Sequence, residues 1–143
     1  MIIGVPLTHL NILATLQNIQ DSYQLHPSDT SYLVMPLFHV HGLIGVLLST
    51  LYSGGSVVLP PKFSVQNFWK DFLEASCTWY SAVPTIHQML LSRVKDTYHG
   101  KNGKLRFIRS CSASLCVTFS HTDICIIPGP FAHLNILGPQ RHY

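Results

Sequence analysis

The sequence predicts an α/β fold in which helices cover both faces of a parallel β-sheet. The first observation is that short apolar runs alternate with segments whose apolar residues recur every three or four positions. The second is that the apolar runs are nearly continuous, as in strands buried on both faces. The chain has 143 residues, 47% of them hydrophobic, which is enough for one domain with a modest core.

The first half of the chain predicts two helices and two strands. Apolar residues recur every three positions over 8–20, which predicts a helix with Thr8 as its N-cap. Residues 31–38 are typical of a strand. Residues 43–52 predict a fully buried helix, and residues 56–59 predict a short strand after a Gly-Gly turn.

The second half continues the alternation as far as residue 110. An aromatic stripe over 65–73 predicts an amphipathic helix capped by Ser64, and we expect this stripe to lie in the core. Residues 78–83 are rich in aromatic and β-branched side chains and predict a strand. A helix over 84–95 and a last strand over 105–110 follow.

Charge, hydropathy and cysteine spacing argue against three classes of protein. Lys and Arg form no dense run and the formal net charge is +3, so we expect no nucleic-acid partner. The most apolar stretch, 42–59, is split by Gly54 and Gly55, so we expect a buried helix and strand there and no membrane span. The four cysteines form no CxxC pair, which favours scattered thiols over disulfides or a zinc site.

Polar residues follow two of the predicted strands. The segment PLFHVHG comes after the 31–38 strand, and SCSASL comes after the 105–110 strand. Ligands of parallel sheets bind at the carboxyl ends of the strands, which share one edge. We therefore expect these two segments to form one ligand site.

Four segments form an ordered set within residues 4–115, namely GVPLTHLN, PLFHVHGL, TWYSAVPTIHQ and KLRFIRSCSASL. Together they resemble the adenylate-forming acyl-CoA synthetases, in particular the oxalate–CoA ligase branch and the neighbouring 4-coumarate–CoA ligases. The resemblance implies that residues 1–115 are part of the N-terminal large domain of an AMP-dependent synthetase/ligase. It also implies a two-step reaction, in which a carboxylate and ATP give an acyl-adenylate and coenzyme A then displaces AMP.

The resemblance implies roles for two histidines. His39 matches the family histidine at the reacting carboxylate and is the candidate catalytic residue. His41 falls at a position of the pocket wall, where it would pair with the second carboxylate of a short acid such as oxalate. These two residues are thus the expected contacts of the acid.

The resemblance also assigns the loop after the last strand to the nucleotide and the acid. Small side chains there let the backbone approach a flat base closely. The residues expected against adenine are Ser110, Cys111, Ser112 and Ala113, and those expected to bond the acid are Ser112 and Ser114.

The sequence departs from the family at both ends. Ile3 stands where the phosphate-binding loop of the family has a lysine, and no Tyr-Gly-x-Thr-Glu motif follows Leu115. We interpret 116–143 as a divergent tail outside the family pattern, such as a retained intron or a shifted frame. ATP, Mg²⁺ and coenzyme A serve the intact family, but we expect this chain to bind none of them firmly, to use no metal ligands of its own and to be inactive alone.

Other interpretations of the same residues remain open. The two histidines are also consistent with core residues bonded to the backbone or with a metal pair, although no third ligand is evident. The serine segment alone is consistent with a simple turn, and no G-x-S-x-G motif supports a hydrolase.

Two alternative functions also remain open. Only 10% of the residues are charged, against about a quarter in a usual domain. An apolar surface that binds a full-length paralogue is therefore one alternative, and a weak binder of nucleotide or dicarboxylate is the other. No targeting signal is recognisable, and the family favours the cytoplasm or the peroxisome.

Overall fold

Five parallel strands form one sheet in the computed structural model, which describes residues 4–97, 104–111 and 133–136. Their order in the sheet is β2-β1-β3-β4-β5. All four neighbouring pairs are parallel, which confirms the predicted sheet. The strands are β1 (Thr30–Tyr32), β2 (Ser56–Val58), β3 (Trp79–Ala82), β4 (Phe107–Ser110) and β5 (His133–Ile136).

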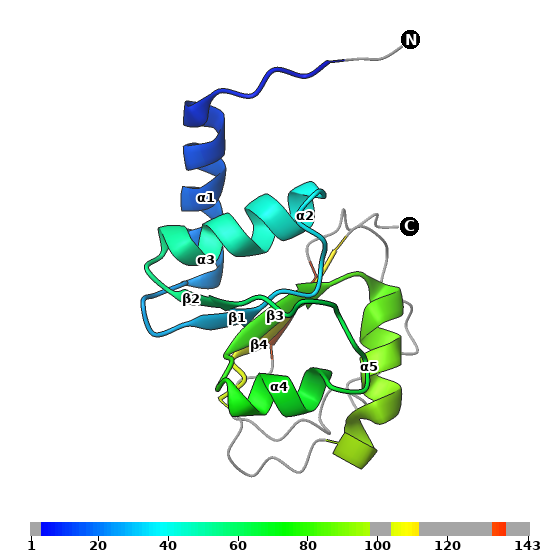
Figure 1. Ribbon diagram of the computed structural model, residues 1–143. Helices are drawn as coiled ribbons and strands as arrows, with labels where there is room; N and C mark the ends of the chain where they lie inside the picture. The colour runs from blue at the N-terminus through cyan, green and yellow to red at the C-terminus, as the bar shows by residue number, and fades with distance from the viewer. Residues whose placement is uncertain (1–3, 98–103, 112–132, 137–143) are drawn as a thin grey trace, which may run out of the picture.

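Helices cover both faces of the sheet, as predicted. Figure 1 shows α1 and the helices that follow β1 on one side of the strands, and α4 and α5 on the other. The helices are α1 (His9–Tyr23), α2 (Val40–Gly42), the π-helix η1 (Leu43–Leu48), α3 (Ser49–Tyr52), α4 (Phe68–Glu74) and α5 (Pro84–Thr97). Because α2, η1 and α3 follow one another without a break, we call them together helix 40–52.

Two hydrophobic cores lie on opposite faces of the sheet. Successive strand residues point to opposite faces, so Trp79 and Tyr80 belong to different cores. The core beneath α4 and α5 consists of Tyr32, Val34, Phe68, Trp69, Phe72, Cys77, Tyr80, Ala82, Leu90, Leu105 and Ile108. The core beneath α1 and helix 40–52 consists of Tyr23, Leu25, Leu33, Val46, Trp79 and Phe107.

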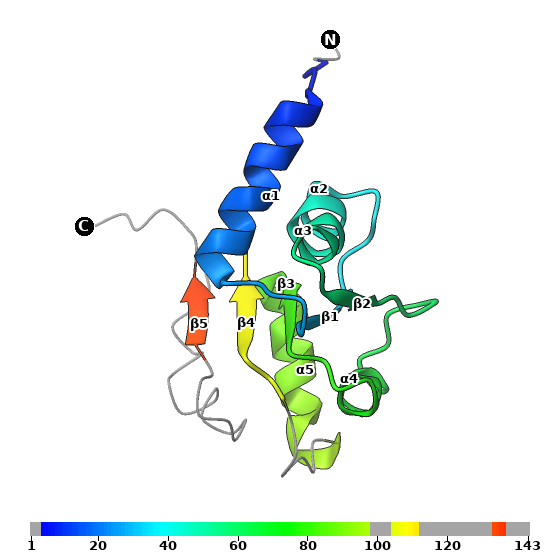
Figure 2. The same cartoon turned by 90° about the vertical axis from the view of Figure 1, so that its left-hand side faces the viewer.

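Helix α1 begins where the sequence predicts but is only partly packed. Thr8 is the N-cap and forms a capping box with Asn11, which satisfies free backbone N–H groups. Leu16 is buried, whereas Leu10 and Leu13 are exposed. Figure 2 shows the cause, because the first turns of α1 extend beyond the sheet.

Three local predictions were wrong. Helix 40–52 is not fully buried, since Leu43, Leu51 and Tyr52 are exposed. Helix α4 begins at Phe68 after Asn67, and Ser64 does not cap it with its side chain; the Ser64 carbonyl instead accepts a bond from the Phe68 N–H. The strand predicted over 31–38 ends at Tyr32, because the chain then leaves the sheet toward helix 40–52.

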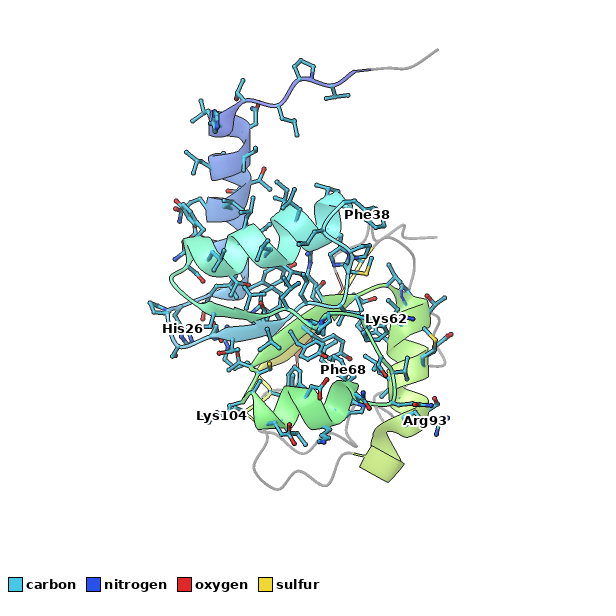
Figure 3. The ribbon with its side chains drawn as sticks, viewed as in Figure 1. His26, Phe38, Lys62, Phe68, Arg93 and Lys104 are labelled. Atoms are coloured by element: carbon cyan, nitrogen blue, oxygen red, sulfur yellow. The ribbon has the colours of Figure 1, made fainter. Side chains whose placement is uncertain are left out.

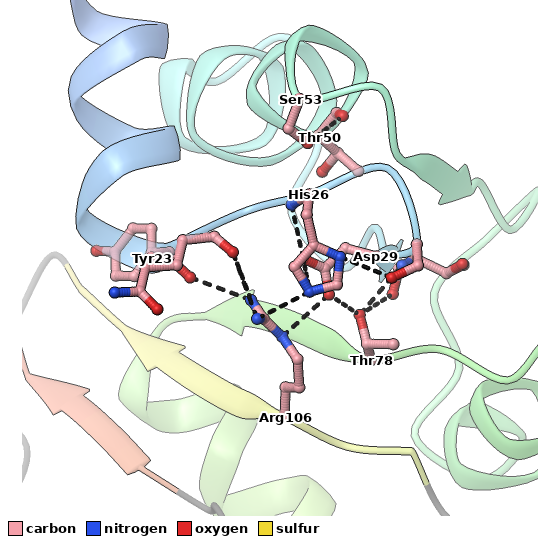
Figure 4. A network of polar contacts seen from close by, with 10 residues as sticks. Tyr23, His26, Asp29, Thr50, Ser53, Thr78 and Arg106 are labelled. Atoms are coloured by element: carbon pink, nitrogen blue, oxygen red, sulfur yellow. Dashed lines mark hydrogen bonds and ion pairs between the residues drawn. The ribbon is translucent and has the colours of Figure 1, made fainter.

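A buried ion pair joins the amino ends of the strands (Figure 4). Arg106 Nε lies 3.0 Å from Asp29 Oδ1, and Thr78 Oγ1 donates to the same oxygen at 2.7 Å. Arg106 also donates to the carbonyls of Tyr23 and Gln24 at the end of α1. The network therefore ties α1 to the starts of β1, β3 and β4.

Strand β5 is an element that the sequence pattern does not predict. It lies within 116–143 and pairs with β4 in parallel, with Ser110 opposite Ile136. The assignment of 116–143 as a divergent tail stays a prediction. Among the described residues no helix combines the length and apolar character needed to cross a membrane.

Candidate functional site

The loop after β1 and the end of β4 meet at the carboxyl edge of the sheet, as predicted. The His41 ring, which follows β1, lies 3.0 Å from Cys111 Sγ, which follows β4. The two residues are 70 positions apart in the chain, so the contact depends on the fold. This edge therefore brings the loop after β1 together with Ser110 and Cys111, the described residues of the second segment that the sequence analysis assigned to the site.

Gly42 lets the loop pack against the start of helix 40–52. A Cβ at this position would lie 2.4 Å from the Pro36 carbonyl oxygen and 2.6 Å from that of Met35. These are backbone atoms that cannot move aside without moving the loop. A glycine is therefore required here, and the close packing fixes the backbone before His39.

His39 is the N-cap of helix 40–52, and its side chain is exposed. Its Nδ1 accepts a hydrogen bond from the His41 N–H at 3.1 Å. A ring nitrogen that accepts a bond carries no proton, so the neutral ring has its proton on Nε2. The start of the helix thus presents His39 as a donor through Nε2.

His41 is buried, with 6% of its surface exposed. Its Nε2 lies 2.7 Å from the Ser81 hydroxyl, which itself donates to the Arg109 carbonyl at 3.3 Å. Burial, together with the positive charge of Arg109, lowers the pKa of His41 to about 4. The ring is therefore neutral near pH 7 and donates to Ser81 through Nε2.

The contact between Cys111 and His41 is not that of a nucleophile and its base. The sulfur lies 3.0 Å from Nδ1 and 3.3 Å from Nε2 of the ring. Because it is almost equidistant from both nitrogens, it does not lie along the lone pair of Nδ1, as a proton transfer requires. This geometry favours a packing contact over a Cys–His catalytic pair.

The predicted nucleotide residues are only partly within the described structure. Ser110 ends β4 on the face of Ile108, opposite to that of Arg109, and its buried hydroxyl has no hydrogen-bond partner among the described residues. Cys111 is half-buried beside His41. Ser112, Ala113 and Ser114 lie outside the described residues.

The site also contains three residues that the sequence analysis did not single out, namely Gly45, Ser81 and Arg109. Ser81 and Arg109 are polar residues within otherwise apolar strands, and this was the signal available in the sequence. Ser81 of β3 is paired with Arg109 of β4, and both side chains point toward helix 40–52. A polar residue on the buried face of a central strand indicates a role at the site or in packing.

Three apolar side chains close to His39 in the sequence are exposed. Phe38 is 94% exposed, and Figure 3 shows it beside α2. Val40 and Leu43 on the same helix are also exposed. Within the described part of the chain, no group of three or more His, Cys, Asp or Glu side chains is placed to hold a metal ion.

Comparison with known proteins identifies the family. A family model described as AMP-binding enzyme matches residues 4–122. The chain is 52% identical over 117 residues to a probable CoA ligase, CCL9, of Humulus lupulus, and 52% identical over 114 residues to an oxalate–CoA ligase of Arabidopsis thaliana. These matches cover 80% and 78% of this chain and 22% of each relative.

A solved structure has the same fold. ATP-bound MatB from Rhodopseudomonas palustris matches with a TM-score of 0.65 and 31% identity, over 76% of this chain and 21% of that chain. The 143-residue chain thus spans about a fifth of the length of the proteins it matches. Since the family model matches more than half of the residues, the chain belongs to the AMP-binding enzyme family.

Proposed function

We propose that this chain is a segment of an ATP-dependent acyl-CoA synthetase of the oxalate–CoA ligase type. Such an enzyme joins a carboxylate to ATP, which releases pyrophosphate, and the thiol of coenzyme A then displaces AMP from the acyl-adenylate. The observation that supports this most is that the His39–His41 loop and the end of β4 share one edge. The 52% identity to an oxalate–CoA ligase of Arabidopsis supports the choice of acid.

His39 is the proposed contact of the reacting carboxylate. Its Nδ1 is occupied by the His41 amide, so its Nε2–H is free to donate to a carboxylate oxygen. The charge on this oxygen changes as the carboxylate attacks ATP. A donor held in place by a helix start lowers the energy of that change without having to reorient.

His41 and the loop after β4 complete the proposed acid site. His41 is held by Ser81 at the inner end of the site, and its neutral ring lies beside the second carboxylate of a short acid. The family resemblance assigns Ser112 and Ser114 to the same acid and the segment 110–113 to the adenine. The small side chains of this segment allow the base to approach the backbone.

The residues described here do not fit a magnesium site. They contain no group of three or more His, Cys, Asp or Glu side chains placed to hold a metal ion. We assign the binding of Mg²⁺, of the triphosphate and of coenzyme A to parts of the intact protein outside these residues. The family resemblance favours the cytoplasm or the peroxisome as the compartment.

A chimera tests the proposal. Residues 4–111 replace the matching segment of the Arabidopsis oxalate–CoA ligase, and pyrophosphate release is measured with ATP, coenzyme A and oxalate. We expect oxalate-dependent turnover, and we expect His39→Ala in the chimera to reduce it by about 100-fold, since His39 is a preorganised donor. A folded chimera without turnover, or one unaffected by His39→Ala, would contradict the proposal.

A second variant tests the assigned acid. His41→Ala in the same chimera should reduce turnover with oxalate more than turnover with a monocarboxylic acid, because only oxalate has a second carboxylate. Equal losses would count against oxalate as the substrate while leaving the synthetase assignment intact.

A second candidate function rests on the exposed apolar side chains of α1 and helix 40–52. Leu10, Leu13, Phe38, Val40 and Leu51 are all exposed, and exposed apolar side chains are typical of a surface that another protein covers. A full-length paralogue is the proposed partner. Co-elution of the chain with a full-length relative in size-exclusion chromatography would support this role, and separate elution would exclude it.

A further inference from the structure

We propose that Arg109 is a specificity-determining residue that makes the acid site prefer acids with two negative charges. This inference rests on the proposed function and deepens it. It assigns the two carboxylates of a short dicarboxylate to different groups. His39 serves the carboxylate that reacts with ATP, and Arg109 supplies the counter-charge for the one that stays ionised.

The position of the Arg109 guanidinium supports this role. Arg109 lies on β4 directly opposite Ser81 of β3, so its side chain points toward helix 40–52. The Tyr23 ring covers it from α1, with Cζ 5.5 Å from the ring centre. The charge is thus held between the sheet and two helices, one residue before Cys111.

Gly45 makes room for the Arg109 side chain. A Cβ on Gly45 would lie 2.9 Å from Arg109 Nη1 and 3.5 Å from His41 Cδ2. The guanidinium and the imidazole therefore both lie next to the Cβ side of this glycine. Gly45 lies within the π-helical turn η1, and π-helical turns occur frequently at functional sites.

The charge of Arg109 has no counter-ion among the described residues. Arg109 Nε and Nη1 are buried without a hydrogen-bond partner there, and none of the ion pairs in the described structure includes Arg109. A buried charge is costly to leave unpaired, whereas the other inward arginine, Arg106, is paired with Asp29. An anionic ligand would supply the missing charge.

The groups next to Arg109 cannot replace its charge. His41 is neutral near pH 7 and contacts Ser81, and the Tyr23 ring presents no formal charge. Arg109 is therefore the cation next to the His41 end of the site. In a partly buried environment its field acts strongly on a nearby carboxylate, even without direct contact.

The experiment measures acid binding by the full chain. Dissociation constants for oxalate and for acetate are determined by NMR titration for the wild type and for Arg109→Gln. We expect the wild type to prefer oxalate, and we expect Arg109→Gln to reduce that preference by about tenfold, the effect of losing one charge-assisted interaction. Arg109→Lys, which keeps the charge, should retain most of the preference.

Two further variants separate this role from a structural one. Gly45→Ala keeps the arginine but places a methyl group against Nη1, so it should also weaken the preference for oxalate. Lys104→Gln removes an exposed charge at the start of β4, at the other end of the sheet, and should leave the preference unchanged (Figure 3).

The outcomes distinguish the inference from the proposed function. Binding with an unchanged oxalate-to-acetate ratio in folded Arg109→Gln would overturn the role of Arg109 and leave the acid site standing. A lower melting temperature with an unchanged ratio would assign Arg109 to packing on Tyr23. No binding of either acid by the folded wild type would overturn both the site and the inference.

Discussion

His41 and Ser81 are joined by a 2.7 Å contact between Nε2 and Oγ, although 40 residues separate them in the chain. The contact connects the loop after β1 to the end of β3. The same imidazole also contacts Cys111 Sγ, 3.0 Å from Nδ1. The orientation of the candidate site therefore depends on a buried hydroxyl that belongs to neither of the two predicted site segments.

Ser81→Ala tests this dependence. The substitution leaves the buried His41 Nε2–H without its acceptor, so we expect the free energy of unfolding to fall by about 1–3 kcal/mol. Urea unfolding at pH 7 measures the loss. The matched control is Ser92→Ala, whose exposed hydroxyl donates to the Met89 carbonyl in its own helix and whose loss should cost less than about 0.5 kcal/mol. Equal losses in both variants would contradict a special role for Ser81.

The stability of the chain should fall as the pH drops from about 6.5 to about 4. Burial lowers the pKa of both His41 and His87 to about 4, from 6.5 in the unfolded chain. In this range the unfolded state binds more protons than the folded state, so acid favours unfolding, and above pH 6.5 the stabilisation is complete. We expect a loss of the order of 3 kcal/mol for each histidine.

Urea unfolding at several pH values measures this dependence. In His87→Asn the slope of the free energy of unfolding against pH should be shallower between pH 4 and 6.5, because one of the two groups is gone. A slope identical to that of the wild type would show that His87 does not contribute.

Asp29→Asn should destabilise the chain strongly. The substitution removes the negative charge that Arg106 Nε meets at 3.0 Å and weakens the acceptor of the Thr78 hydroxyl. Breaking a buried pair on one side leaves the other charge uncompensated, and because Arg106 is partly exposed we expect a loss of about 2–4 kcal/mol.

The control for this variant is Glu74→Gln, which removes the exposed pair with Lys70. Exposed pairs contribute little, so its melting temperature should stay close to that of the wild type. If both variants have the same melting temperature, the network of Figure 4 does not stabilise the starts of the strands.

Gly42→Ala should displace the loop that carries His39. The new Cβ would meet the Pro36 carbonyl oxygen at 2.4 Å, and relief of this overlap should cost about 1–3 kcal/mol. Thermal unfolding measures the cost, and the NMR signals of the His39 ring report the displacement. Gly4→Ala is the control, because nothing lies within 4 Å of a Cβ at that position. An unchanged His39 signal in Gly42→Ala would contradict the prediction.

The 143-residue chain should show negligible adenylation by itself. Ile3 stands where the phosphate-binding loop of the family has a lysine, and charge neutralisation is the main contribution of a protein to chemistry at phosphorus. Pyrophosphate release from ATP is measured with oxalate and other short acids. Turnover at the usual enzymatic scale of about 1 s⁻¹ would contradict this expectation.

Much of the fold could be predicted from periodicity and composition. Local patterns predicted the parallel sheet, the strands over 78–83 and 105–110 and the aromatic stripe of α4. A strand buried on both faces is almost continuously apolar, whereas a helix buried on one face has apolar residues every three or four positions. Thr8 was a correct cap because its partner Asn11 lies three residues away. Ser64 was a wrong one, since the helix starts only after an intervening turn.

The sequence by itself determined the type of fold, the two polar segments at strand ends and the edge they share, because these depend on local chemistry and on the direction of parallel strands. Only the tertiary structure decided that His39 accepts from a helix amide, that His41 bonds Ser81 and that Arg109 lies beside Gly45 without a counter-ion. Partners separated by tens of residues leave no periodic trace in a sequence. Their contacts are set by how the helices pack on the sheet.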